Sequence, residues 1–125
     1  MSKFKYDVIN WMSDVEEKDY PAAASYLSLI YSPEQVADII AKLKLAGLVQ
    51  YKAKDIFRAS QLSLLGVSNS HVEKDRKKIL KGKSLSPLLL VRDLTVGKVV
   101  IADGYHRLCA IYEFNEDELI YCKII

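Results

Sequence analysis

The residues best suited to chemistry stand together as one uninterrupted run: Asp103, Gly104, Tyr105, His106 and Arg107. A β-like stretch, 98–102, precedes this run and a helical stretch follows it, so the pattern predicts a strand-to-helix turn. Glycine lets a backbone bend tightly and approach a ligand. The N–H groups of a first helical turn have no intrahelical partners, and here His and Arg side chains lie beside them. The turn therefore predicts a site for a small phosphate-bearing ligand.

Each residue of this turn has an expected role and an alternative one. Arg107 is expected to clamp a phosphate with two hydrogen bonds, and its alternative is an ion pair with a carboxylate. His106 is expected to donate to a phosphate oxygen or to act as an acid or base, and a structural hydrogen bond is its alternative. Asp103 is a candidate ligand of Mg²⁺ held through phosphates, or a helix cap. Gly104 and Tyr105 complete the expected ligand contacts, and Asp103 and His106 are the candidates for catalysis.

Lysines form a second feature of the sequence. Residues 51–87 contain nine Lys or Arg against three Asp or Glu, a local net charge of +6 in a chain whose formal net charge is +2. Lys74, Lys77, Lys78 and Lys81 recur at the spacing of one helix face. Lys81 and Lys83 stand just before the strand at 88–91 and are also candidate ligand contacts. Such a stripe suits a polyphosphate or a nucleic acid, and a solvated helix face is the alternative.

The composition limits the class of protein. A chain of 125 residues with 50% hydrophobic residues is expected to fold as one domain. No apolar run approaches the length of a membrane span, and the first residues lack the apolar core of a secretion signal. Cys109 and Cys122 show no zinc-ligand spacing, so we expect a reduced, cytoplasmic protein without a membrane partner. A homodimer is compatible with this composition.

Hydrophobic periodicity and turn residues predict the elements that position the turn. The expected fold class is α+β, with residues 1–47 forming a helical subdomain packed on a small mixed sheet. Ser32 begins a capping box, with Pro33 at the first helical position and Gly47 at the end of that helix. Asp19 is expected to cap the preceding helix, which extends to Tyr31. The other expected elements are helices at 5–16, 52–60, 72–81 and 106–114, strands at 88–91, 98–102 and 119–125, and a short strand or extended connection at 62–65.

The order of these elements carries a resemblance to a known superfamily. A glycine-ended helix leads to a strand that begins at Pro87, and a hairpin leads to a Gly-x-His-Arg helix and a closing strand. The residues that match lie at 79–91 and 99–110. This arrangement resembles the ParB/sulfiredoxin superfamily over residues 60–125, and the whole chain is similar to small bacterial ParB-like proteins.

The resemblance implies nucleotide binding at the turn, with ATP or CTP and Mg²⁺ as the implied cofactors. ParB partition proteins hold CTP with a Gly-Glu-Arg-Arg turn, which Gly104 and Arg107 match, while Tyr105 and His106 differ. The nucleophilic cysteine of sulfiredoxin is replaced by Tyr105, so the motif excludes sulfiredoxin activity. Free serine kinases carry Asp-Gly-His-His-Arg, which differs only at Tyr105. Their catalytic glutamate has no counterpart at 63–71.

Three hypotheses remain open from the sequence. The first is a ParB-like domain that binds a nucleotide or another phosphate-bearing small ligand at Asp103–Arg107, with phosphotransferase and nucleotidase reactions as compatible activities. The second is a non-catalytic regulatory or interaction module with a vestigial pocket. The third is a weak nucleic-acid binder that uses the stripe from Lys74 to Lys81.

Overall fold

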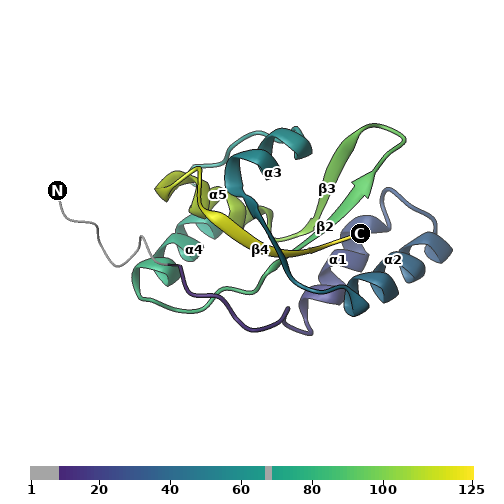
Figure 1. Cartoon of the computed structure of the whole chain (residues 1–125), viewed down its shortest axis with the longest axis horizontal. Coiled ribbons are helices and arrows are strands. Elements are labelled where there is room, and N and C mark those ends of the chain that lie inside the picture. Colours follow the sequence, from purple (N-terminus) through teal and green to yellow (C-terminus); the bar gives the residue numbers. More distant parts are fainter. Residues whose placement is uncertain (1–8, 67–68) are drawn as a thin grey trace.

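A computed structural model describes residues 9–66 and 69–125, and within them the chain forms five α-helices and one four-stranded mixed sheet (Figure 1). The helices are α1 (Asp19–Leu27), α2 (Pro33–Leu45), α3 (Ala53–Ser60), α4 (Ser70–Leu80) and α5 (Tyr105–Phe114). The strands are β1 (Val49–Lys52), β2 (Leu88–Asp93), β3 (Lys98–Asp103) and β4 (Leu119–Ile124). The predicted α+β class is confirmed.

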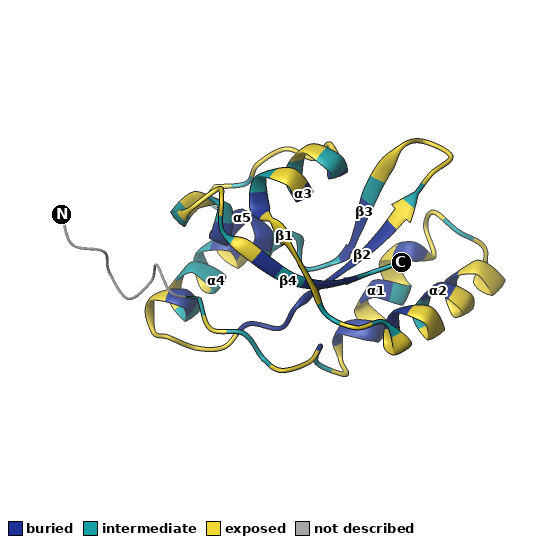
Figure 2. Ribbon diagram, in the orientation of Figure 1, coloured by how far each residue is buried: buried dark blue, intermediate teal, exposed yellow. Residues whose placement is uncertain are grey.

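The sheet has the strand order β1-β4-β2-β3. The β1–β4 and β2–β3 pairs are antiparallel, whereas β2 and β4 run parallel at its centre. Strand β2 is flanked by neighbours on both edges, and its first four residues are buried (Figure 2). This burial explains the continuous apolar run Leu88–Val91, because a central strand covered on both faces needs apolar residues at every position.

Alternate residues of the sheet enter two separate cores. Leu88 and Leu90 pack with the helices α3, α4 and α5 on one face. Leu89 and Val91 pack with α1 and α2 on the other face. The N-terminal helices therefore form one layer of the fold, and the turn at the end of β3 lies where α5 leaves the sheet (Figure 1).

The helix predicted at 5–16 is wrong over its described part, residues 9–16; residues 1–8 lie outside the described residues. Trp11 instead forms an isolated parallel bridge with Leu85. The amide of Leu85 donates to the Asn10 carbonyl at 2.8 Å, and the amide of Met12 donates to the Leu85 carbonyl at 2.8 Å. Among the described apolar residues of this stretch, Val15 is buried, and Trp11 and Met12 are half-buried in an extended segment that pairs with a distant part of the chain.

The observed bounds of the two N-terminal helices differ from the predicted bounds, while the predicted capping box of the second helix is present. Ser32 and Gln35 form the predicted capping box. The Gln35 amide donates to the Ser32 hydroxyl at 3.2 Å, and the Ser32 amide donates to the Gln35 side-chain oxygen at 3.0 Å. Helix α2 ends at Leu45, two residues before the predicted Gly47. Helix α1 ends at Leu27 rather than at Tyr31, and Asp19 is its first residue rather than its cap. The Asp19 side chain is instead buried in the protein.

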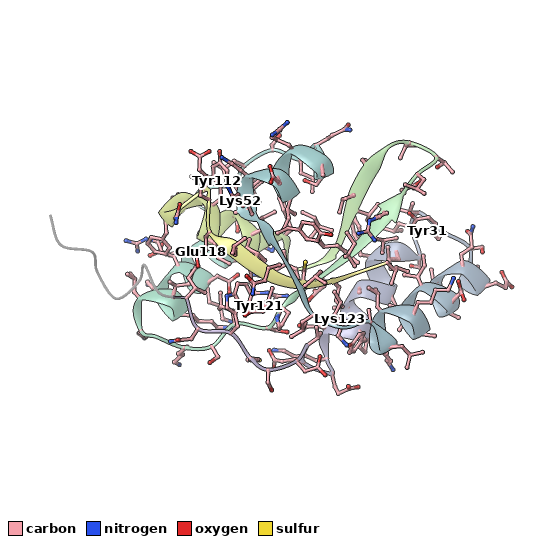
Figure 3. All side chains as sticks on the ribbon, in the orientation of Figure 1. Tyr31, Lys52, Tyr112, Glu118, Tyr121 and Lys123 are labelled. Atoms are coloured by element: carbon pink, nitrogen blue, oxygen red, sulfur yellow. The ribbon has the colours of Figure 1, made fainter. Side chains whose placement is uncertain are left out.

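Two side chains fasten this layer to the sheet (Figure 3). The Tyr31 hydroxyl donates to the Asp93 carboxylate at 2.9 Å, which joins the α1–α2 connection to the β2–β3 hairpin. The Lys123 ammonium, on β4, donates to the Tyr20 hydroxyl and to the Lys44 carbonyl, each at 3.1 Å. Lys123 is 4% exposed, so these bonds compensate an ammonium that has left water.

The middle of the chain contains one element that the sequence did not reveal. Strand β1 lies at the sheet edge with all four residues exposed, so it shows no alternation of buried and exposed positions. Residues 62–65 form an extended connection and no strand. The predicted helices at 52–60 and 72–81 correspond to α3 and α4. Gly82 follows α4 with a φ of +73°, which agrees with its predicted role as the helix stop.

Two expectations about the protein class can be compared with the structure. No helix within residues 9–66 and 69–125 combines the length and the apolarity that crossing a bilayer requires. Cys109 and Cys122 are both free and fully buried. Cys109 therefore acts as a small core residue.

Candidate functional site

The turn between β3 and α5 is built around Gly104. Its φ is +106°, a backbone conformation that residues with a side chain rarely adopt. A Cβ atom at this position would lie 2.6 Å from Leu88 Cγ and 2.9 Å from Arg107 Nη2. Gly104 is the N-cap residue of α5, and no side chain caps this helix end. The first amides of α5 therefore remain available to an acceptor.

A small polar hollow of about 190 Å³ opens at this turn; we call it the turn hollow. One wall comes from the turn and from the start of α5, and the opposite wall comes from α4. Its lining side chains carry three permanent cations, two carboxylates and two imidazoles. The lining residues are His71, Lys74, Asp75, Lys78, Asp103, Gly104, His106 and Arg107.

Arg107 is engaged by acids inside the protein. Its Nη2 lies 3.1 Å from Asp103 Oδ2 and 3.7 Å from Asp19 Oδ2, and its side chain is 17% exposed. The same nitrogen lies 3.5 Å from the Pro87 carbonyl. Its Nε is buried without a hydrogen-bond partner among the described residues. The ion pair that the sequence offered as the alternative for Arg107 is therefore present at the turn.

A buried network extends from this ion pair into α1. The Ser86 hydroxyl donates to Asp19 Oδ2 at 2.6 Å, and the Glu16 amide donates to the Ser86 hydroxyl at 3.0 Å. Asp19 and Ser86 are 5% and 3% exposed. Because Asp19 also faces Arg107, the position of the guanidinium depends on the packing of α1 against the sheet.

Burial shifts the ionisation of several groups in the turn hollow. It raises the pKa of Asp103, with the Arg107 charge opposing the shift and Asp19 adding to it. It also raises the pKa of Asp75, against the attraction of Arg107 and other nearby cations. Burial lowers the pKa of His106 below its ordinary 6.5, and the charge interaction with His71 lowers it further. His106 is therefore mainly neutral at pH 7 and has a nitrogen that can accept a proton.

A second hollow of about 430 Å³ adjoins the first and is mostly apolar; we call it the apolar hollow. Asp103, Gly104 and His106 line both hollows. Tyr105 lines only the apolar one, and its hydroxyl donates to the Ser63 carbonyl. The remaining lining residues are Ala22, Tyr26, Leu62, Ile101 and Ala102. The imidazole of His106 lies on the boundary, 5.6 Å from the Tyr105 ring centroid and 4.9 Å from that of His71.

A third hollow, of about 540 Å³, lies along α4; we call it the lysine hollow. It adjoins the turn hollow, because Lys74 and Lys78 line both. Five lysines and one glutamate make up its charged lining, so its net charge is strongly positive. The lining residues are Ser70, Glu73, Lys74, Lys77, Lys78, Lys81 and Lys83.

The structure therefore distributes the predicted contacts among three adjacent hollows. Gly104, His106 and Arg107 line the turn hollow with Asp103, whereas Tyr105 lines only the apolar one. Lys81 and Lys83 line only the lysine hollow. The described residues contain no group of three or more His, Cys, Asp or Glu that could hold a metal ion. The Mg²⁺ contact of Asp103 requires phosphate oxygens as further ligands, so it stays a prediction.

Asp75, Asp19 and Ser86 were missed from the sequence as parts of the site, and Lys78 was expected only in the lysine stripe. His71, Asp75 and Lys78 face the turn because they recur at three- and four-residue intervals on α4, a spacing that is visible in the sequence. Their relation to the turn depends on the packing of α4 beside α5. Asp19 and Ser86 gave no local signal, since their contact joins residues 67 positions apart.

Comparison of this chain with models of known protein families, with curated proteins and with solved structures found no match.

Proposed function

We propose that the protein binds a nucleotide or another phosphate-bearing small ligand at the Asp103–Arg107 turn. The observation that carries this proposal is the turn hollow itself. It combines the uncapped N-terminus of α5 with Lys74, Lys78 and two imidazoles. Free amides at a helix start and nearby cations are the groups that bind phosphate oxygens. A volume of about 190 Å³ suits one phosphate group and its hydration.

The apolar hollow is suited to bind an organic part of the ligand. Tyr26 and Leu62 are 44% and 40% exposed, so both present apolar surface that a flat ring could cover. Asp103, Gly104 and His106 separate this surface from the cationic wall. A nucleotide has a matching arrangement, with a flat ring at one end and phosphate at the other. ATP and CTP, each with Mg²⁺, are the first ligands to test.

The proposal extends to phosphotransferase or nucleotidase activity through His106. Phosphoryl transfer needs charge neutralisation and a group that orients or deprotonates the nucleophile. His106 faces the turn hollow, and its lowered pKa keeps a proton-accepting nitrogen available near neutral pH. Asp103 is held by Arg107, so its role in this proposal is to position the guanidinium and to contact Mg²⁺ through phosphate.

A non-catalytic interaction module with a vestigial pocket is the second candidate. The pairing of Arg107 with Asp103 and Asp19 favours it, because two carboxylates of the protein itself neutralise this guanidinium. The two candidates differ in one measurable property. A ligand site stabilises the folded chain when its ligand is added, whereas a vestigial pocket leaves the stability unchanged.

The melting temperature with phosphate, ATP and CTP, each with and without Mg²⁺, tests the proposal. A ligand at one hundred times its Kd adds about 2.7 kcal/mol to the free energy of unfolding, so at least one of these ligands should raise the melting temperature by several degrees. Lys78→Gln should reduce this shift, because Lys78 lines the turn hollow. Lys98→Gln is the matched control, since Lys98 is an exposed residue of β3 that lines none of the three hollows.

An unchanged melting temperature with every ligand would favour the vestigial pocket. Equal effects of the two substitutions would show that the shift reflects overall charge and not this site. Arg107→Ala is a poor probe, because it leaves two carboxylates without their cation. Breaking a buried pair in this way costs about 3–5 kcal/mol, so loss of the fold would be confused with loss of binding.

A further inference from the structure

The lysine hollow concentrates more positive charge than the fold itself neutralises. Glu73 is its one acid, and Arg76 and Lys77 already approach that carboxylate at 3.5 and 4.0 Å. The other four lysines form no ion pair within the part of the chain that the structure describes; they are Lys74, Lys78, Lys81 and Lys83.

This arrangement opposes the stability of α4. Like charges four residues apart, as in Lys74/Lys78 and Lys77/Lys81, destabilise a helix, and an anion that neutralises them removes the repulsion. The helix dipole favours Lys77 and Lys78, which lie in the last turn. It does not account for Lys74, in the middle of the helix, or for Lys83, beyond its end.

The three hollows follow one another in a definite order. The apolar hollow and the turn hollow share Asp103, Gly104 and His106, and the turn hollow and the lysine hollow share Lys74 and Lys78. The apolar and lysine hollows share no lining residue. The turn hollow therefore lies between them. From Lys74 to Lys81 the helix rises by about 10 Å, so the lysine hollow is longer than one phosphate group.

We propose that the lysine hollow is a second anion subsite, which takes the distal phosphates of a linear phosphate chain whose first phosphate lies in the turn hollow. This inference rests on the proposed function, and it deepens it by requiring a ligand with at least two linked phosphates. The chemistry is that of an inorganic polyphosphate or of the tail of a nucleoside di- or triphosphate. The turn hollow has room for one phosphate group and is followed by apolar surface, so the phosphate-binding region is short, which favours a short phosphate chain over a continuous nucleic-acid strand.

Calorimetric titration with orthophosphate, pyrophosphate and tripolyphosphate at one ionic strength tests the subsite. The affinity of the wild-type chain should increase with each added phosphate. The double variant Lys77→Gln/Lys81→Gln should weaken tripolyphosphate binding by about tenfold or more, because it removes two charge-assisted contacts. The same variant should leave orthophosphate binding within about twofold, since both lysines line only the lysine hollow. Titration with ATP or CTP distinguishes inorganic polyphosphate from a nucleotide as the source of the phosphate chain. A nucleoside triphosphate binds more tightly than tripolyphosphate only if the apolar hollow takes its ring.

The double variant Lys42→Gln/Lys98→Gln is the matched control, since it removes the same charge from exposed positions outside the hollows. Equal losses in both double variants would overturn the subsite. Equal affinity for orthophosphate and tripolyphosphate would overturn it too, and would leave the turn site intact. If no phosphate compound binds the wild-type chain, both proposals fail. Tighter binding of single-stranded DNA than of tripolyphosphate, abolished by Lys77→Gln/Lys81→Gln, would make this hollow a nucleic-acid surface and overturn the inference.

Discussion

Replacement of Gly104 by alanine tests the geometry on which the turn depends. The new Cβ would lie 2.6 Å from Leu88 Cγ and 2.9 Å from Arg107 Nη2, both closer than van der Waals contact allows. Leu88 is 0% exposed and sits in the core, so it has little room to move. The φ of +106° adds backbone strain for any residue with a Cβ.

The steric overlap and the backbone strain together set the expected loss in the free energy of unfolding. A non-glycine residue at positive φ costs about 1–2 kcal/mol, and overpacking of a core costs about 1–3 kcal/mol. Gly104→Ala should therefore lower the free energy of unfolding by about 2–5 kcal/mol, a large part of the ~5–15 kcal/mol typical of a domain. Urea denaturation, with the midpoint and the slope both fitted, measures this change.

Substitutions at two other glycines separate the cost of backbone strain from the cost of overpacking. Gly97 has a φ of +66°, and a Cβ added to it would meet no atom within 4 Å, so Gly97→Ala should show only the backbone cost of about 1–2 kcal/mol. Gly47 has open space and no positive φ, so Gly47→Ala should be neutral or stabilising by about 0.4–1 kcal/mol. If Gly104→Ala costs no more than Gly97→Ala, the close contact of Gly104 with Leu88 and the guanidinium does not constrain the turn.

Three further substitutions give independent tests by urea denaturation. Ser86→Ala removes the donor to the buried Asp19 carboxylate and should cost about 1–3 kcal/mol; a change below about 0.5 kcal/mol would contradict the network. Ser32→Ala removes the capping box of α2 and should cost about 0.5–2 kcal/mol, and an unchanged midpoint would contradict its role. Burial raises the pKa of Asp75, so the stability linked to its protonated form is complete below pH 3.8 and is lost as the pH rises through the raised value. Asp75→Asn should therefore gain stability relative to wild type between about pH 3 and pH 7, and a relative loss over that range would show that its charge is stabilised by the cations around it.

Local signals account for the parts of the fold that the sequence predicted. The Ser32 capping box, the apolar run at 88–91 and the glycine after β3 each act within a few residues, so their patterns are readable without the rest of the chain. The resulting helices and strands place the Asp103–Arg107 turn at the start of α5, as expected.

Long-range pairing explains what the sequence could not reveal. Trp11 belongs to an extended segment because Leu85 offers it a backbone partner 74 residues away. The exposed edge strand β1 exists because β4 provides its hydrogen bonds, and its own residues carry no alternation. The pairing of Arg107 with Asp19 depends in the same way on α1 folding back over the sheet.

The most direct test of the central claim is a phosphate titration followed by amide chemical shifts in two-dimensional NMR. Shift changes that saturate and are concentrated on the amides of Gly104 to Arg107 and on the residues of α4 facing them would support a phosphate site at this turn. Amides of the β2–β3 hairpin tip, 94–97, serve as an internal reference and should not move. Saturating changes elsewhere, or none at the Gly104–Arg107 amides, would contradict the claim.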